Sequence, residues 1–182
     1  MLTKDLINKK VVMVVASENF RDEEYFIPKE VLENREVEVK TASNKLGIAK
    51  GAGGQEAAVD LLVADVNPAD FDAVVFIGGS GALQNLDNEV SYNLTKATIK
   101  QGKILAAICI SPVILAKAGV LSGKEATVWS SPLDQEPVKI LEENGAKYVG
   151  KKVAIDNKII TANGPLAAKE FGEAIVKAIE EF

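Results

Sequence analysis

The stretch KILAAICISP, residues 103–112, decides the class of fold. Its first six residues, Lys103 to Ile108, form an apolar run of the length of a buried strand. Cys109 follows at once, and Pro112 suits the first turn of a helix, where its missing N–H costs nothing. We therefore predict a core strand, a sharp turn at Cys109 and a helix that continues to Ala118.

Such a strand-to-helix turn is a nucleophile elbow, which requires small residues two positions either side of the reactive one. Ala107 and Ser111 meet that requirement. The following helix would present its positive end to the thiol, so we expect the pKa of Cys109 to be lower than its free value of about 8.5. The alternative interpretation is that Cys109 is only a small buried hydrophobic residue.

Elsewhere the sequence alternates between predicted strands and predicted helices. We expect strands at 10–16, 36–41, 71–77, 153–155 and 158–161, and helices at 22–34, 88–101, 133–144 and 165–182. Residues 44–54 are expected to be a loop, and residues 56–63 a short strand or hairpin arm. The alternation predicts an α/β fold with a mostly parallel sheet covered by helices on both faces, in a single domain over 1–182.

In parallel sheets, ligands bind at the carboxyl ends of the strands. Two candidate features fall there, Cys109 and the pair Gly78-Gly79. Glycines allow close approach of the backbone to a ligand, although Gly78-Gly79 can equally be a simple turn.

Composition narrows the possible functions. The chain of 182 residues carries a net charge of −5, which argues against nucleic acid or an anionic membrane as the main partner. It has one cysteine and no histidine, so Cys-His and Ser-His-Asp mechanisms are excluded, and a metal site is not expected. No apolar run is long enough to span a membrane, and the first ten residues are too polar for a secretory signal, so we expect a cytoplasmic protein.

Four segments together resemble the ThiJ/PfpI superfamily, also called the parkinsonism-associated deglycase family. They are FRDEEYFIP (20–28), VVFIGGSGALQNL (74–86), AAICISPVILAKAGVLSGKEAT (106–127) and ITANGP (160–165). The resemblance covers nearly the whole chain in the right order and implies a flavodoxin-like sandwich that is usually dimeric. A homodimer or higher homo-oligomer is therefore expected.

The resemblance also implies roles for several residues. A glutamate four residues before Pro28, here Glu24, would hydrogen-bond the Cys109 sulfur and move a proton, although spacing alone does not separate Glu24 from Asp22 and Glu23. The backbone N–H groups of Gly79 and Ile110 would hold an oxyanion, with Gly78, Arg21, Ser111 and Trp129 around the pocket.

The chain departs from the family pattern at three of these positions. Ile110 stands where the intracellular-protease branch has histidine, Trp129 where other members have histidine, and Ser111 replaces the glycine of the elbow. Trp129 either floors the pocket or belongs to the core. Arg21 either stabilises a thiolate, pairs with Glu24 or lies on the surface.

Three functional hypotheses follow. The leading one is a cysteine-dependent, cofactor-free stress-response protein acting on small reactive carbonyl compounds, of glyoxalase or deglycase type. The second is a non-enzymatic redox sensor or protective holdase that uses oxidation of Cys109. The third is a degenerate family member that keeps the fold without an active site. Such members are labelled intracellular proteases, but this chain lacks the Cys-His pair that a protease would need.

Overall fold

The computed structural model describes residues 6–182, and its centre is a seven-stranded sheet. The strands are β1 (Lys10–Val15), β3 (Glu38–Ser43), β6 (Leu61–Leu62), β7 (Ala73–Phe76), β8 (Ile104–Ile108), β11 (Val153–Asp156) and β12 (Ile159–Ala162). Their order is β11-β12-β8-β7-β1-β3-β6. Neighbours are parallel throughout, except for the antiparallel pair β11 and β12 at one edge.

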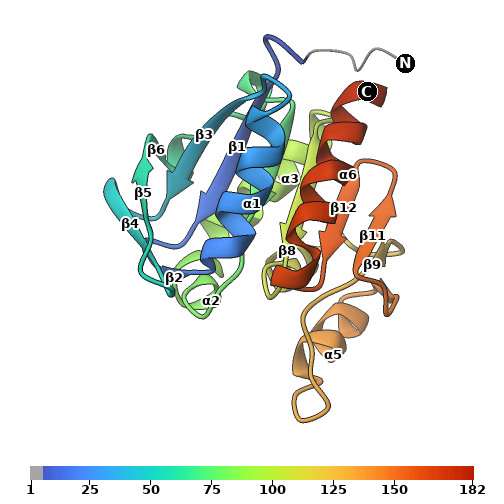
Figure 1. Ribbon diagram of the computed structural model, residues 1–182. Helices are drawn as coiled ribbons and strands as arrows, with labels where there is room; N and C mark the ends of the chain where they lie inside the picture. The colour runs from blue at the N-terminus through green and yellow to red at the C-terminus, as the bar shows by residue number, and fades with distance from the viewer. Residues whose placement is uncertain (1–5) are drawn as a thin grey trace.

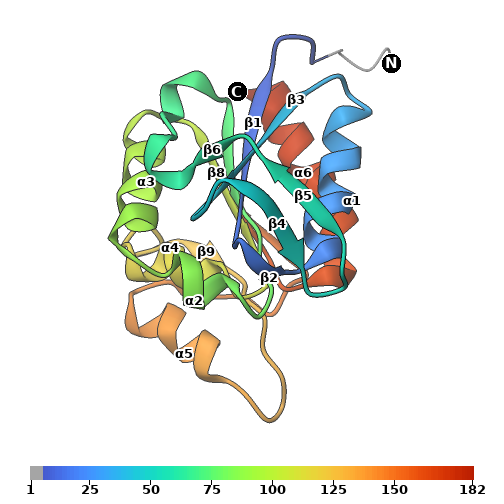
Figure 2. The same cartoon turned by 90° about the vertical axis from the view of Figure 1, so that its left-hand side faces the viewer.

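Helices cover both faces of this sheet (Figures 1 and 2). One face packs against α1 (Asp22–Glu33) and α6 (Ala168–Glu181), and the other against α3 (Glu89–Lys100), α4 (Pro112–Lys117) and α5 (Glu136–Glu143). Alternate residues of β1 supply the two cores: Val11, Met13 and Val15 face the first pair of helices, and Val12 and Val14 face the second set. The predicted mixed α/β fold with a mostly parallel sheet is confirmed.

The predicted loop over 44–54 is wrong. It contains β4 (Gly47–Gly51), which pairs antiparallel with β5 (Glu56–Val59) and parallel with β2 (Glu18–Phe20). The glycines of this segment lower its strand propensity. Hydrogen bonding to two neighbouring strands stabilises β4 in spite of that low propensity. The hairpin arm expected over 56–63 is present as β5 followed by β6.

Several short elements escape prediction because they are too short to show a period. They are α2 (Ala82–Leu86), β9 (Glu125–Ala126), β10 (Lys147–Tyr148) and a 3-10 turn at Val63–Asp65. Two further 3-10 turns lie at Pro68–Asp70 and Pro165–Ala167. The helices α5 and α6 begin three residues later than expected, at Glu136 and Ala168. Within residues 6–182 no helix is long and apolar enough to cross a membrane.

Candidate active site

Cys109 lies at the predicted elbow between β8 and α4. Its φ of +64° places it in the left-handed region, which an L-residue rarely adopts without support. That support comes from both of its backbone groups: the Cys109 N–H donates to the Ala162 carbonyl at 2.8 Å, and the Trp129 N–H donates to the Cys109 carbonyl at 2.8 Å. The strained turn is therefore fixed by neighbouring strands and loops, and its prediction is confirmed.

Gly78, at the end of the adjacent strand β7, lets Glu24 approach Cys109. A Cβ atom at Gly78 would lie 2.6 Å from Cys109 Cβ and 2.6 Å from Glu24 Oε2. The Gly78 N–H donates to Glu24 Oε2 at 3.1 Å. Glycine is thus required here, because any side chain would separate the carboxyl from the thiol.

Glu24 comes from the first turn of α1, and its side chain is fully buried. Its Oε1 atom has no hydrogen-bond partner among the described residues. Burial raises the pKa of Glu24 to about 7, with the Cys109 thiol and the Gly78 N–H opposing the rise. Near neutral pH, Glu24 is therefore able both to give and to accept a proton.

The expectation of a lowered thiol pKa is wrong while Glu24 is ionised. Burial, followed by the charge of Glu24, raises the pKa of Cys109, and the N–H groups of Gly79 and Ile110 only partly offset this. The helix α4 has just six residues, so its dipole contributes little. Because two adjacent anions in a buried site are costly, we expect the pair to keep one shared proton and to form a thiolate only when Glu24 holds that proton.

A pocket of about 510 Å³ opens in front of this pair. Its lining consists of Arg21, Glu24, Ala52, Gly79, Ser80, Leu83, Cys109, Ile110, Trp129 and Pro165. Six of the predicted site residues meet there, and Trp129 is a wall of the pocket. Ala52, Ser80, Leu83 and Pro165 were not predicted, since the sequence does not reveal which loop residues converge.

Two residues predicted for the pocket do not line it. Ser111 is fully buried, and its hydroxyl donates to the Ile77 carbonyl at 2.6 Å, so it ties the elbow to β7. Gly78 lies behind the pair as the donor to Glu24. Both residues therefore support the site through hydrogen bonds and not as part of the pocket lining.

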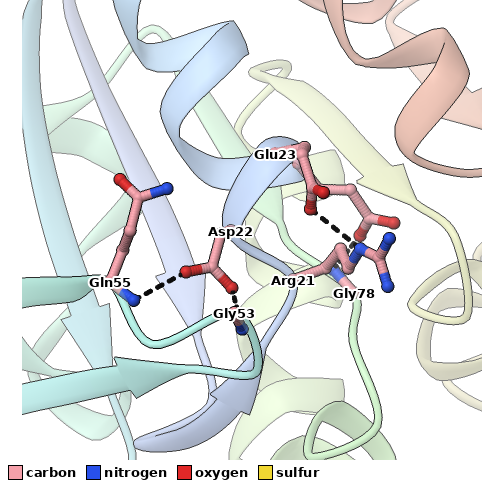
Figure 3. A network of polar contacts seen from close by, with 7 residues as sticks. Arg21, Asp22, Glu23, Gly53, Gln55 and Gly78 are labelled. Carbon is pink, nitrogen blue, oxygen red and sulfur yellow. Dashed lines mark hydrogen bonds and ion pairs between the residues drawn. The ribbon is translucent and has the colours of Figure 1, made fainter.

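One interpretation of the sequence pairs Arg21 with Glu24, but the structure pairs Arg21 with a different acid. Arg21 Nε donates to Glu23 Oε2 at 2.8 Å (Figure 3). Its backbone N–H donates to the Gly78 carbonyl at 3.0 Å, which joins the start of α1 to the end of β7. The side chain lines the pocket while remaining 47% exposed.

Asp22 is a residue whose role sequence reasoning missed. It is buried, and its carboxylate accepts hydrogen bonds from the Gly53 N–H at 2.6 Å and the Gln55 N–H at 2.9 Å (Figure 3). Asp22 thereby fixes the turn between β4 and β5, which carries the pocket residue Ala52. No spacing in the sequence connects this acid with that turn.

Within residues 6–182, no cluster of three or more histidine, cysteine or acidic side chains is arranged to hold a metal ion.

Comparisons with known proteins identify the family of this chain. The model of the DJ-1/PfpI family matches residues 9–178, and the chain belongs to that family. It is similar to the uncharacterized protein MJ0967 of Methanocaldococcus jannaschii, with 40% identity over 98% of this chain and 86% of the relative. It is also similar to the deglycase PYRAB04690 of Pyrococcus abyssi, with 32% identity over 85% of this chain and 90% of the relative.

Among solved structures, the ThiJ/PfpI domain protein from Brachyspira murdochii superposes with a TM-score of 0.90. The two chains are 32% identical, and the match covers 97% of this chain and 98% of the other. The flavodoxin-like sandwich expected from the resemblance is therefore confirmed.

Proposed function

We propose that this protein acts on small reactive carbonyl compounds through Cys109, as a glyoxalase- or deglycase-type enzyme that needs no cofactor. The observation that carries the proposal is the buried Glu24 beside Cys109 at one pocket, with its Oε1 free of any partner among the described residues. A carboxyl with a pKa of about 7 next to a thiol is suited to proton transfer at neutral pH. The Pyrococcus abyssi relative is a deglycase by name, which supports the same class of activity.

The first step would form a hemithioacetal. Sγ of Cys109 attacks the aldehyde carbon, a C–S bond forms, and the carbonyl oxygen takes the proton that the pair shares. The backbone N–H groups of Gly79 and Ile110 hold that oxygen while its charge develops.

With a 2-oxoaldehyde such as methylglyoxal, the ionised Glu24 would then remove the proton from the former aldehyde carbon and return it to the neighbouring carbon. The hydroxyl proton on the former aldehyde carbon passes to the ketone oxygen in the same shift. This shift gives a thioester on Cys109. Water hydrolyses the thioester to lactate and regenerates the thiol, so no oxidant or reductant is consumed.

The test is incubation with methylglyoxal, with lactate as the measured product. We expect turnover by the wild type, none by Cys109→Ala, and a loss of at least about 100-fold in Glu24→Gln, in line with the removal of a general acid-base. Circular dichroism would establish that both variants are folded. Equal rates for the wild type and Cys109→Ala would refute the proposal.

A second candidate is the redox sensor. Cys109 is the free cysteine of the chain, is partly exposed, and faces the N–H groups of Gly79 and Ile110, which suit an oxidised sulfur. Mass spectrometry after mild peroxide treatment tests this function. Conversion of Cys109 to sulfinic acid supports it, and a Cys109 that stays reduced at modest oxidant excludes it.

One observation favours the degenerate alternative: burial and the charge of Glu24 raise the pKa of the Cys109 thiol, which keeps it protonated and unreactive. If the protein neither forms lactate nor is oxidised at Cys109 by peroxide, the degenerate alternative, a fold without an active site, is supported.

A further inference from the structure

The lining of the pocket is uneven in charge. Among its described lining residues, Arg21 is the cation and Glu24 is the acid, while Ala52, Leu83, Ile110, Trp129 and Pro165 are apolar. Glu24 is buried beside Cys109, whereas Arg21 is half-exposed and permanently charged. A ligand entering from solvent therefore meets a positive charge.

The guanidinium of Arg21 also has unused donors. Its Nε is bonded to Glu23, but neither Nη atom has a hydrogen-bond partner among the described residues. A guanidinium carries five N–H donors, and its two Nη atoms suit the two oxygens of a carboxylate.

Glu23 does not cancel this charge within the pocket. Glu23 lies outside the lining and is 49% exposed. At Glu24, the electrostatic effect of Arg21 exceeds the opposing effect of Glu23. Glu23 thus pairs with Nε from outside the pocket lining and leaves both Nη atoms of Arg21 without a partner among the described residues.

We propose that the pocket selects anionic substrates, namely reactive aldehydes that carry a carboxylate, and that Arg21 binds this carboxylate while Cys109 adds to the aldehyde. The proposal rests on the proposed function for the identity of the reacting group. The addition is the hemithioacetal step: the C–S bond forms, and the thiol proton passes to the carbonyl oxygen.

Alkylation of Cys109 tests the selection without any turnover. Iodoacetate and iodoacetamide transfer groups of similar size to sulfur with loss of iodide, and only the first is an anion. We expect the ratio of their rate constants, iodoacetate over iodoacetamide, to fall at least about threefold from the wild type to Arg21→Gln at low salt. In the wild type, the ratio should also fall as salt rises from 0.02 to 1 M, because the screening length shortens to about 3 Å.

Three further variants sharpen the result. Lys100→Gln removes an exposed cation from the end of α3, outside the pocket lining, and should leave the ratio unchanged. Arg21→Lys should keep part of the preference, since it keeps the charge without the planar fork. The double variant Arg21→Gln/Glu23→Gln should stay well below the wild type. Recovery of the wild-type ratio by the double variant, or no change in Arg21→Gln, would overturn the proposal.

A second measurement uses reversible addition of two small aldehydes. Glyoxylate carries a carboxylate and glycolaldehyde does not, so we expect glyoxylate to protect Cys109 from iodoacetamide better in the wild type than in Arg21→Gln. Glycolaldehyde should protect both equally. If lactate formation fails while this anion preference holds, the proposed enzyme activity is wrong and the anion site stands; if lactate forms and the preference is absent, only the anion site is wrong.

Discussion

At the scale of single residues, the site is the partly exposed Cys109 beside the fully buried Glu24. The sequence suggests a solitary thiolate activated by a helix end, whereas the structure has a helix of six residues and a carboxyl whose pKa burial raises to about 7. We therefore expect the reactivity of the thiol to depend on the protonation of Glu24. Peptidase chemistry through a Cys-His pair stays excluded, because the chain has no histidine.

The closeness of the pair depends on Gly78. In Gly78→Ala, the new Cβ would lie 2.6 Å from Cys109 Cβ and 2.9 Å from the Ile108 carbonyl oxygen, so we expect a loss of about 1–3 kcal/mol of stability and a changed rate of Cys109 alkylation. Thermal unfolding and alkylation by iodoacetamide measure these effects.

Gly150→Ala is the matched control, because only the Tyr148 hydroxyl, 4.0 Å away, would lie near its Cβ. If Gly78→Ala were as stable and reactive as this control, the close packing of Glu24 and Cys109 would be disproved.

At the scale of elements, the elbow could be predicted and the β4–β5 hairpin could not. The elbow has a local signal in an apolar run, small flanking residues and Pro112. The hairpin depends on long-range partners, above all on Asp22, which accepts hydrogen bonds from Gly53 and Gln55. A Cβ at Gly51 would lie 2.5 Å from the Asp22 carboxylate oxygens. Glycine at this position therefore allows the strand to pack closely against Asp22, although the glycine content of the segment predicts a loop.

Removing the Asp22 carboxylate should loosen that hairpin. In Asp22→Ala, the N–H groups of Gly53 and Gln55 lose their acceptor, and we expect a loss of about 1–3 kcal/mol. Hydrogen exchange followed residue by residue should show faster exchange at these two amides. Glu30→Gln, at an exposed position of the same helix, is the control that should leave exchange at these amides unchanged. Unchanged exchange in Asp22→Ala would contradict the role of Asp22.

At the scale of the whole molecule, the parallel sheet brings the site together. β7 and β8 are neighbours, so Gly78 and Cys109 meet at their carboxyl ends, and α1 delivers Glu24 to the same edge. Strand alternation predicted this sheet correctly. The pocket walls, in contrast, come from loops, and Ala52 and Pro165 could not be found without three-dimensional placement.

The buried Glu24 should make folding stability depend on pH. Its pKa rises from 4.5 to about 7 on folding, so the folded state holds a proton that the unfolded state releases between these values. The free energy of unfolding should therefore fall by about 3 kcal/mol as pH rises through this window. Urea unfolding at pH 4.5 and 8 should show this loss in the wild type but not in Glu24→Gln; identical pH profiles would contradict the raised pKa.

The oligomeric state expected from the family resemblance is a homodimer or higher homo-oligomer. The hairpin leaves apolar side chains exposed at Leu46 and Ile48, which suits contact with another chain. Sedimentation equilibrium should return at least twice the mass of the chain, and the mass of a single chain at micromolar concentration would contradict the expectation.

The most direct test of the shared proton is the rate of Cys109 alkylation by iodoacetamide between pH 5 and 10, in the wild type and in Glu24→Gln. Fully protonated, the pair holds two protons, and a fraction of thiolate forms only after one of them is lost. The alkylation rate of the wild type should therefore rise with an inflection near pH 7, which follows the raised pKa of Glu24. In Glu24→Gln that inflection should be absent, and a single titration of the thiol should remain. An inflection near pH 7 in both proteins, or in neither, would contradict the pairing of Glu24 with Cys109.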